Sequence, residues 1–133
     1  HGLCGQNRPL EKTRQNRVKS AMKKAWLKVK NQVLGEKYDL SFSYAENGEM
    51  WRLNKIYRKK DHPANVLSFP LSSNEGEILI NKTYRGSDYA DYLFIHSLFH
   101  LKGLKHSKKM DEKEAKIMKE LYPAKYEKIM NAA

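Results

Sequence analysis

The hydrophobic and polar positions of the chain follow two periods, one typical of strands and one typical of helices. Residues 38–44 alternate between apolar and polar side chains, which predicts a half-buried strand. Two short apolar runs, 66–69 and 77–81, predict buried strands, and Pro70 closes the first of them. The pattern therefore predicts three strands.

Between and after these segments, apolar residues recur at the spacing of a helix. This spacing predicts helices over 12–34, 50–58, 88–102 and 111–122, and a short helix that reaches about residue 131. The helix over 12–34 places basic residues opposite one apolar stripe. The helix over 88–102 is apolar around most of its circumference, so we expect it to be central and buried.

Local signals predict where some of these elements begin. Asn47 and Gly48 form a turn signal before the second helix. Asp88 is expected to cap the helix over 88–102. Asp111 and Glu114 have the spacing of a capping box for the helix that follows.

The interleaved strands and helices predict an α/β (α+β) fold. We expect a mixed sheet of three to four strands packed with four to five helices. The length of 133 residues suits one small domain with one core, and no internal repeat or low-complexity linker divides the chain.

The charge of the chain favours a polyanionic partner. There are 26 Lys and Arg residues against 15 Asp and Glu, a formal net charge of +11, so RNA or DNA is the expected partner and a solvated basic surface is the alternative. The single cysteine, Cys4, excludes an internal disulfide and fits a reducing cytoplasm, and no further role is assigned to it. No apolar run has the length of a membrane span, and no signal-peptide pattern is found.

Three of the five histidines fall within eleven residues, at spacings that suit a metal ion. His96 and His100 project from one helical face one turn apart. Gly103 can end that helix, and the chain can then return His106 to the same point. Three neutral imidazoles around one divalent cation leave a fourth position open, as in a catalytic zinc site. The alternative is that the three are unrelated polar residues near a helix end.

The spacing His-x3-His-x5-His is also that of the ligands in metzincin metalloproteases, and Gly103 stands at the matching glycine. Those enzymes carry a glutamate after the first histidine as general base, whereas this chain has Ser97. Serine does not take up a proton near neutral pH, so the sequence argues against a protease of that mechanism.

Several segments together resemble the YbeY family of bacterial metal-dependent endoribonucleases. They are the histidine segment 96–106, the segment 53–70 with its Val66-Leu67-Ser68-Phe69-Pro70 run, and Gly76-Glu77-Ile78. The resemblance covers about 38–130 and implies a sheet-plus-helices fold with the metal helix at its centre. It implies one Zn²⁺, or another divalent transition metal such as Ni²⁺, held by His96, His100 and His106. It further implies a cytoplasmic, single-strand-specific endoribonuclease in ribosomal RNA maturation and ribosome quality control, with ribosomal RNA, ribosomal proteins or ribosome-associated GTPases as partners.

Arg58 stands at the place of the family's arginine in an Asn-x-x-x-Arg stretch. The resemblance implies that Arg58 lies near the metal and acts in catalysis together with His96, His100 and His106. The physical case is that a guanidinium is always charged and can clamp a scissile phosphate. The alternative makes Arg58 a surface residue of a basic loop.

The chain departs from the family pattern in several places. Ala64 and Asn65 replace the usual Thr-Asp, and Lys105 replaces the aspartate before the third histidine. The loss of two carboxylates near the metal is expected to alter metal affinity or rate. The segment between Ile80 and the histidine helix is shorter than is usual in the family. The first family strand is not found before the N-terminal helix.

We expect residues 1–9 to be a disordered or appended N-terminus and 10–133 to form a single metal-dependent hydrolase domain. His62 is interpreted as a surface histidine, and Ser68 and Phe69 as the end of a buried strand.

Two alternatives to the endoribonuclease stay open. One is a non-catalytic RNA- or ribosome-binding factor in which the metal only stabilises the fold, and the other is a metal hydrolase of another substrate.

Overall fold

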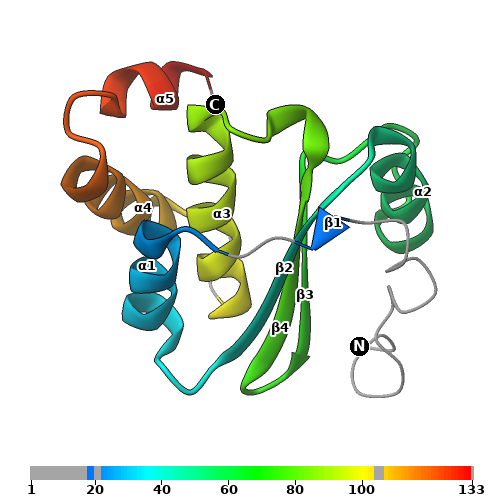
Figure 1. Ribbon diagram of the computed structural model, residues 1–133, viewed down its shortest axis with the longest axis horizontal. Coiled ribbons are helices and arrows are strands. Elements are labelled where there is room, and N and C mark those ends of the chain that lie inside the picture. Colours follow the sequence, from blue (N-terminus) through cyan, green and yellow to red (C-terminus); the bar gives the residue numbers. More distant parts are fainter. Residues whose placement is uncertain (1–17, 20–21, 104–106, 133) are drawn as a thin grey trace.

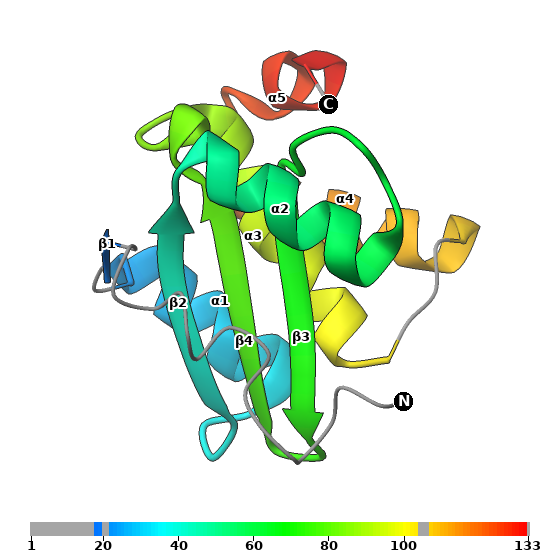
Figure 2. The same cartoon turned by 90° about the vertical axis from the view of Figure 1, so that its right-hand side faces the viewer.

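The computed structural model of the protein describes residues 18–19, 22–103 and 107–132, and a mixed sheet runs through its middle (Figures 1 and 2). The strands are β1 (Val18–Lys19), β2 (Asp39–Ala45), β3 (Val66–Ser72) and β4 (Glu75–Asn81). Their order is β1-β2-β4-β3; β2 and β4 are parallel, whereas the other two pairs are antiparallel. The expected mixed sheet of three to four strands is confirmed.

Helices cover both faces of this sheet. They are α1 (Lys24–Leu34), α2 (Asn47–Arg58), the 3₁₀ helix η2 (Lys82–Tyr84), α3 (Asp88–Leu101), α4 (Lys108–Leu121) and α5 (Tyr126–Ala132). Helix α2 lies on one face, and α1, α3 and α4 lie on the other (Figures 1 and 2). The α/β (α+β) architecture predicted from the sequence is therefore confirmed, and none of these described helices is long and apolar enough to cross a membrane.

Alternation along the strands gives each face its own apolar core. On one face, Leu67 and Phe69 of β3 pack in a cluster with Met50 and Leu53 of α2. The opposite face contributes to a larger cluster, in which the rings of Trp26 (α1), Phe42 (β2) and Phe94 (α3) meet. Trp26 and Phe94 stack with centroids 4.3 Å apart, and Phe42 meets Trp26 edge-on at 5.2 Å.

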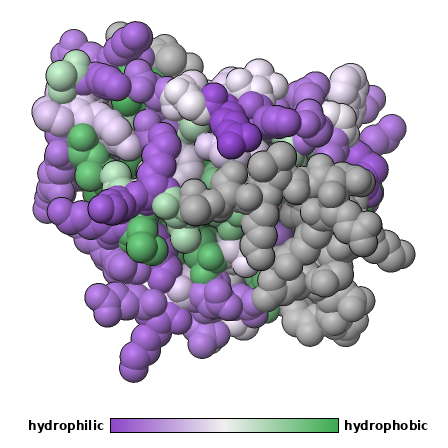
Figure 3. All heavy atoms as spheres, viewed as in Figure 1, coloured by the Kyte–Doolittle hydropathy of each residue, from purple (hydrophilic) through white to green (hydrophobic). Residues whose placement is uncertain are grey.

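Helix α3 is the central helix, as its apolar circumference predicted. It contacts α1, α4, α5, β3 and β4. Its buried Asp91 accepts a hydrogen bond from the Trp26 indole at 2.7 Å and forms an ion pair with Lys23 at 3.4 Å. Gly103 follows its end with φ of 97°, a conformation that favours glycine, and donates its N–H to the His100 carbonyl at 2.9 Å. Hydrophilic side chains cover much of the face shown in Figure 3.

The predicted helix over 12–34 is wrong in its described N-terminal part. Val18 and Lys19 form β1, and the helix begins only at Lys24; residues 12–17 lie outside the described residues. Val18 pairs with Tyr44 and Lys19 with Ser43, so the edge of β2 gains backbone partners that a helix would not give it. This pairing overrides the helical spacing, and β1 is the strand that the sequence did not reveal.

Three helix starts also differ from the prediction. Asn47 begins α2 instead of forming a turn. The side chain of Ser87, not Asp88, caps α3 by accepting from Ala90 N–H at 3.2 Å. Ser107 caps α4 in the same way, so the capping box of Asp111 and Glu114 is wrong; each serine lies just outside the apolar period that defined the helix.

Candidate active site

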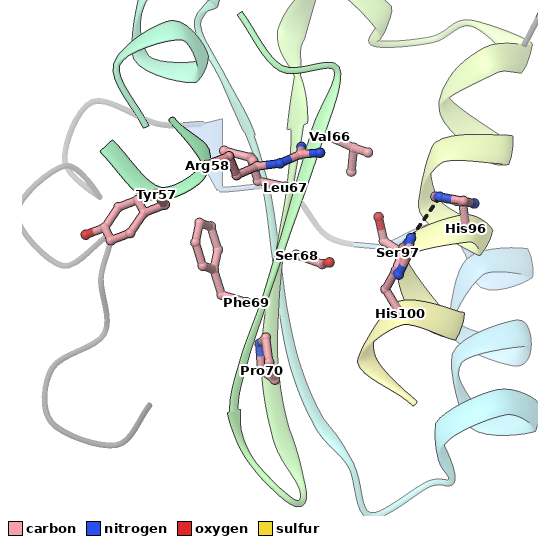
Figure 4. A pocket seen from close by; sticks show the side chains of 10 residues that line it. All are labelled: Tyr57, Arg58, Val66, Leu67, Ser68, Phe69, Pro70, His96, Ser97 and His100. Atoms are coloured by element: carbon pink, nitrogen blue, oxygen red, sulfur yellow. Dashed lines mark hydrogen bonds between the residues drawn. The ribbon is translucent and has the colours of Figure 1, made fainter. Parts of the chain in front are cut away.

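Helix α3 places two histidine side chains one turn apart on the same face. The Nε2 atoms of His96 and His100 are 2.9 Å apart, and their rings meet nearly edge-on, with centroids at 4.5 Å and planes at 80° (Figure 4). Neither ring is fully buried, and 14% of the His96 side chain is exposed. The Nε2 atoms of the two imidazoles therefore point toward the same accessible position.

Glu114 of α4 fixes the orientation of His96. Its carboxylate Oε2 makes a short contact with His96 Nδ1, and only 1% of the Glu114 side chain is exposed. When Nδ1 donates its proton to this carboxylate, the lone pair of Nε2 faces His100. A carboxylate behind an imidazole is a common support of a metal-binding histidine.

Sequence reasoning missed this residue, because it placed Glu114 in a capping box. A signal was present: Met110, Glu114 and Met118 follow at intervals of four, so a carboxylate interrupts a buried helical stripe. A buried carboxylate needs a partner, and that need points to a neighbouring cation or N–H group.

A cavity of about 460 Å³ opens between β3, α3 and the end of α2 (Figure 4). Its wall includes Arg58 from α2, Val66 and Ser68 from β3, and His96, Ser97 and His100 from α3. Along β3, Val66 and Ser68 lie toward the histidine helix, whereas Phe69 turns to the other side of the sheet and meets Tyr57 edge-on at 5.5 Å. The alternation of β3 thus turns Ser68 toward the histidine helix and Phe69 toward the core on the other face, and both residues line the cavity.

The end of α2 positions Arg58. Lys59 adopts the left-handed conformation with φ of 59° and ends the helix. The buried side chain of Asn54 holds the following loop by donating to the His62 carbonyl at 2.8 Å. The Arg58 side chain is exposed, and in Figure 4 its guanidinium points toward Val66 and the histidine helix.

A second hollow of about 500 Å³ shares Arg58, Val66 and His96 with the first cavity. Its wall also contains Tyr92, whose ring stacks on that of His96 with centroids 5.5 Å apart. The pKa of Tyr92 is raised to about 12, first by burial and then by the negative charge of Glu114, with smaller contributions from Tyr89 and Asp111. Tyr92 is therefore a neutral phenol at physiological pH.

The structure brings together Arg58, His96 and His100 in the wall of one cavity. His106 and Lys105 lie outside the described residues. Within the described ranges, no group of three His, Cys, Asp or Glu side chains is arranged to hold a metal ion. His62 is exposed, as expected for a surface histidine.

The fold and the site define a small α/β domain with a cavity between a paired-histidine helix and an arginine at a helix end. The family model described as "Endoribonuclease YbeY" matches residues 5–130, and the chain belongs to this family. The family predicted from the sequence is confirmed.

Named relatives and one solved structure show the extent of the similarity. The chain is 34% identical to "Endoribonuclease YbeY" of Alkaliphilus metalliredigens, over 62% of this chain and 64% of that one. It is 35% identical to the protein of the same name in Finegoldia magna, over 63% and 64% of the two chains. The chain thus matches less than two thirds of the length of these two relatives. A solution structure of a Thermotoga maritima protein aligns with a TM-score of 0.44 at 22% identity, covering 90% of this chain and 87% of that one.

Proposed function

We propose that this protein is a metal-dependent endoribonuclease that cleaves single-stranded RNA at the cavity between β3 and α3. The observation that carries the proposal is the convergence of His96 and His100 Nε2 at 2.9 Å, in a cavity whose wall also includes Arg58. Membership of a family described as endoribonucleases supports the same activity.

The donor set suits a zinc-type ion. His96 and His100 would supply two imidazole ligands, and His106, three residues after Gly103, would supply the third. Glu114 would hold His96 in the tautomer that offers Nε2. Imidazole ligands accept Zn²⁺ and Ni²⁺ alike, and the bound ion would act as a Lewis acid on a phosphate oxygen.

Arg58 would bind the scissile phosphate. Its guanidinium is always charged and presents paired N–H donors that match two phosphate oxygens. An exposed side chain at the edge of the cavity can reach a polymer that passes across the surface, which a buried arginine cannot do. Stabilising the charge that develops on the phosphate is the expected contribution.

The formal net charge of +11 supports RNA as the substrate, because phosphate neutralisation supplies much of the affinity of such proteins. The proposed role is in ribosomal RNA maturation and ribosome quality control. We place this role in the cytoplasm, with ribosomal proteins or ribosome-associated GTPases as partners. Family membership alone supports this part of the proposal.

Cleavage of a ribosomal RNA fragment with single-stranded loops tests this function. The purified chain is compared with Arg58→Ala, His100→Ala and Arg52→Ala; Arg52 is an exposed arginine of the same helix and serves as the matched control. We expect the wild type and Arg52→Ala to cut, Arg58→Ala to cut about 10²–10³-fold more slowly, and His100→Ala or a chelator to abolish cleavage.

Identical preparations control for contaminating nuclease. If all four preparations cut at one rate, the activity is not that of this site. If all bind the RNA and none cuts it, the protein is an RNA-binding factor in which a metal only stabilises the fold.

A further inference from the structure

A row of aromatic side chains leads along α3 to the histidine pair. Tyr89, Tyr92 and His96 are three and four residues apart, which places them on one face of the helix. The centroids of Tyr89 and Tyr92 are 6.1 Å apart with planes at 18°, and those of Tyr92 and His96 are 5.5 Å apart with planes at 30°. Tyr84 of η2 meets Tyr89 edge-on at 5.0 Å. Three roughly aligned rings therefore end at the candidate active site.

Hydrogen bonds from Asn65, the residue just before β3, hold two of these tyrosine hydroxyls. The Asn65 side chain donates to the Tyr89 hydroxyl at 3.2 Å and accepts from the Tyr84 hydroxyl at 3.2 Å. Rings that are fixed before a ligand arrives lose little conformational entropy when they bind it. Asn65 itself is exposed.

The row is accessible and lies beside cationic side chains. Tyr89 and Tyr92 are only half-buried, and they line the hollow of about 500 Å³ together with the exposed Arg58 and Lys60. Asp111 is the acidic residue in the same wall. This volume lies in the range of about 300–1,000 Å³ that is typical of ligand pockets.

The tyrosines also pack against the larger core, but both stay half-buried and line the hollow. Unpaired bases stack on aromatic side chains, and Lys or Arg side chains follow the backbone of the same strand. The bases of a duplex are already stacked and cannot use such a surface.

We propose that Tyr89 and Tyr92 form a stacking platform for unpaired RNA bases next to the scissile phosphate, with Lys60 and Arg58 on the backbone. The platform rests on the proposed endoribonuclease function, because it assigns the recognition of single strands to the same site. The preference for single-stranded RNA then comes from contacts with the unpaired bases, whereas Arg58 and Lys60 contact the phosphates of any RNA.

Binding without cleavage tests the platform. In a His100→Ala background with chelator present, affinity is measured for a fluorescently labelled single-stranded RNA and for an abasic strand of equal length and charge. We expect Tyr89→Leu to weaken binding of the normal strand about 5- to 140-fold, the equivalent of about 1–3 kcal/mol, and to leave the abasic strand unchanged. Tyr89→Phe keeps the ring but loses the hydrogen bond from Asn65, so its affinity should fall much less than that of Tyr89→Leu.

Tyr126→Leu is the matched control, because Tyr126 is a half-buried tyrosine of α5 that lines neither cavity. Thermal unfolding shows whether each variant keeps its fold, and Tyr92→Leu provides a second variant if Tyr89→Leu does not. Equal affinity of Tyr89→Leu and its parent for the normal strand overturns the platform even if the wild type cleaves RNA. A Tyr89-dependent preference for bases in a protein that cleaves nothing supports the platform and overturns the catalytic proposal.

Discussion

Replacement of Glu114 by Gln tests the fold of this protein separately from the metal site that we propose for it. The Glu114 carboxylate is 1% exposed and contacts His96 Nδ1. Gln keeps the volume of the side chain, and its amide oxygen can still accept from Nδ1–H, so no cavity results and His96 keeps its acceptor. Only the negative charge behind the imidazole is lost.

The two effects of this change have opposite signs. A buried carboxylate costs more desolvation than an amide, so without metal Glu114→Gln should leave the free energy of unfolding unchanged or raise it. Outer partners of metal-binding histidines contribute about 10–100-fold in metal affinity, which is about 1.4–2.8 kcal/mol. Metal binding should therefore weaken by that factor while the metal-free fold stays intact.

Competition against a chromogenic zinc chelator measures the affinity, and denaturant unfolding with excess chelator measures the fold. Glu112→Gln, at an exposed position of the same helix, controls for the loss of one negative charge. Equal zinc affinity of Glu114→Gln and Glu112→Gln, with both folded, would refute the reasoning that Glu114 supports a metal ligand.

Three further predictions concern stability. Gly76→Ala should lower the free energy of unfolding by about 1–3 kcal/mol in denaturant titrations, because an added Cβ would collide with the Tyr38 hydroxyl. Gly48→Ala is the control, because the space around Gly48 is open and its free energy of unfolding should not fall. An unchanged free energy of unfolding in Gly76→Ala would contradict this packing. The contribution of Tyr92 to stability should be constant below about pH 10 and fall between pH 10 and pH 12, because its pKa is raised to about 12 and the folded state retains a proton that the unfolded state releases. Ultraviolet titration of the tyrosines alongside alkaline unfolding checks this, and no loss of stability between pH 10 and pH 12 would contradict it. Zinc at 100 times its Kd should stabilise the wild type by about 2.7 kcal/mol, and His106→Ala should lose most of this gain in thermal unfolding; full stabilisation of that variant would remove His106 from the ligand set.

Elements with a strong local pattern could be predicted from the sequence. The apolar circumference of α3 indicated a buried central helix, and the alternation over 38–44 indicated β2, because burial on a known face dictates the residue types. His96 and His100 could be paired for the same reason, since i and i+4 positions of a helix always lie together.

Features that depend on distant partners could not be predicted. The two-residue strand β1 exists because Val18 and Lys19 pair with β2, and such a short segment carries no period of its own. Glu114 contacts His96 across two helices, and Asn65 contacts Tyr84 and Tyr89 from a loop. Each contact depends on how separate elements dock, which hydrophobic spacing does not encode.

The central claim is that one metal ion at the His96–His100 pair is required for RNA cleavage. The most direct measurement strips the purified chain of metal and follows cleavage of a single-stranded ribosomal RNA fragment as Zn²⁺ is added back, with His100→Ala in parallel. The account predicts that cleavage rises with added ion and reaches its plateau near one ion per chain, while His100→Ala stays inactive. Full cleavage by the stripped chain, or equal recovery in His100→Ala, would contradict it.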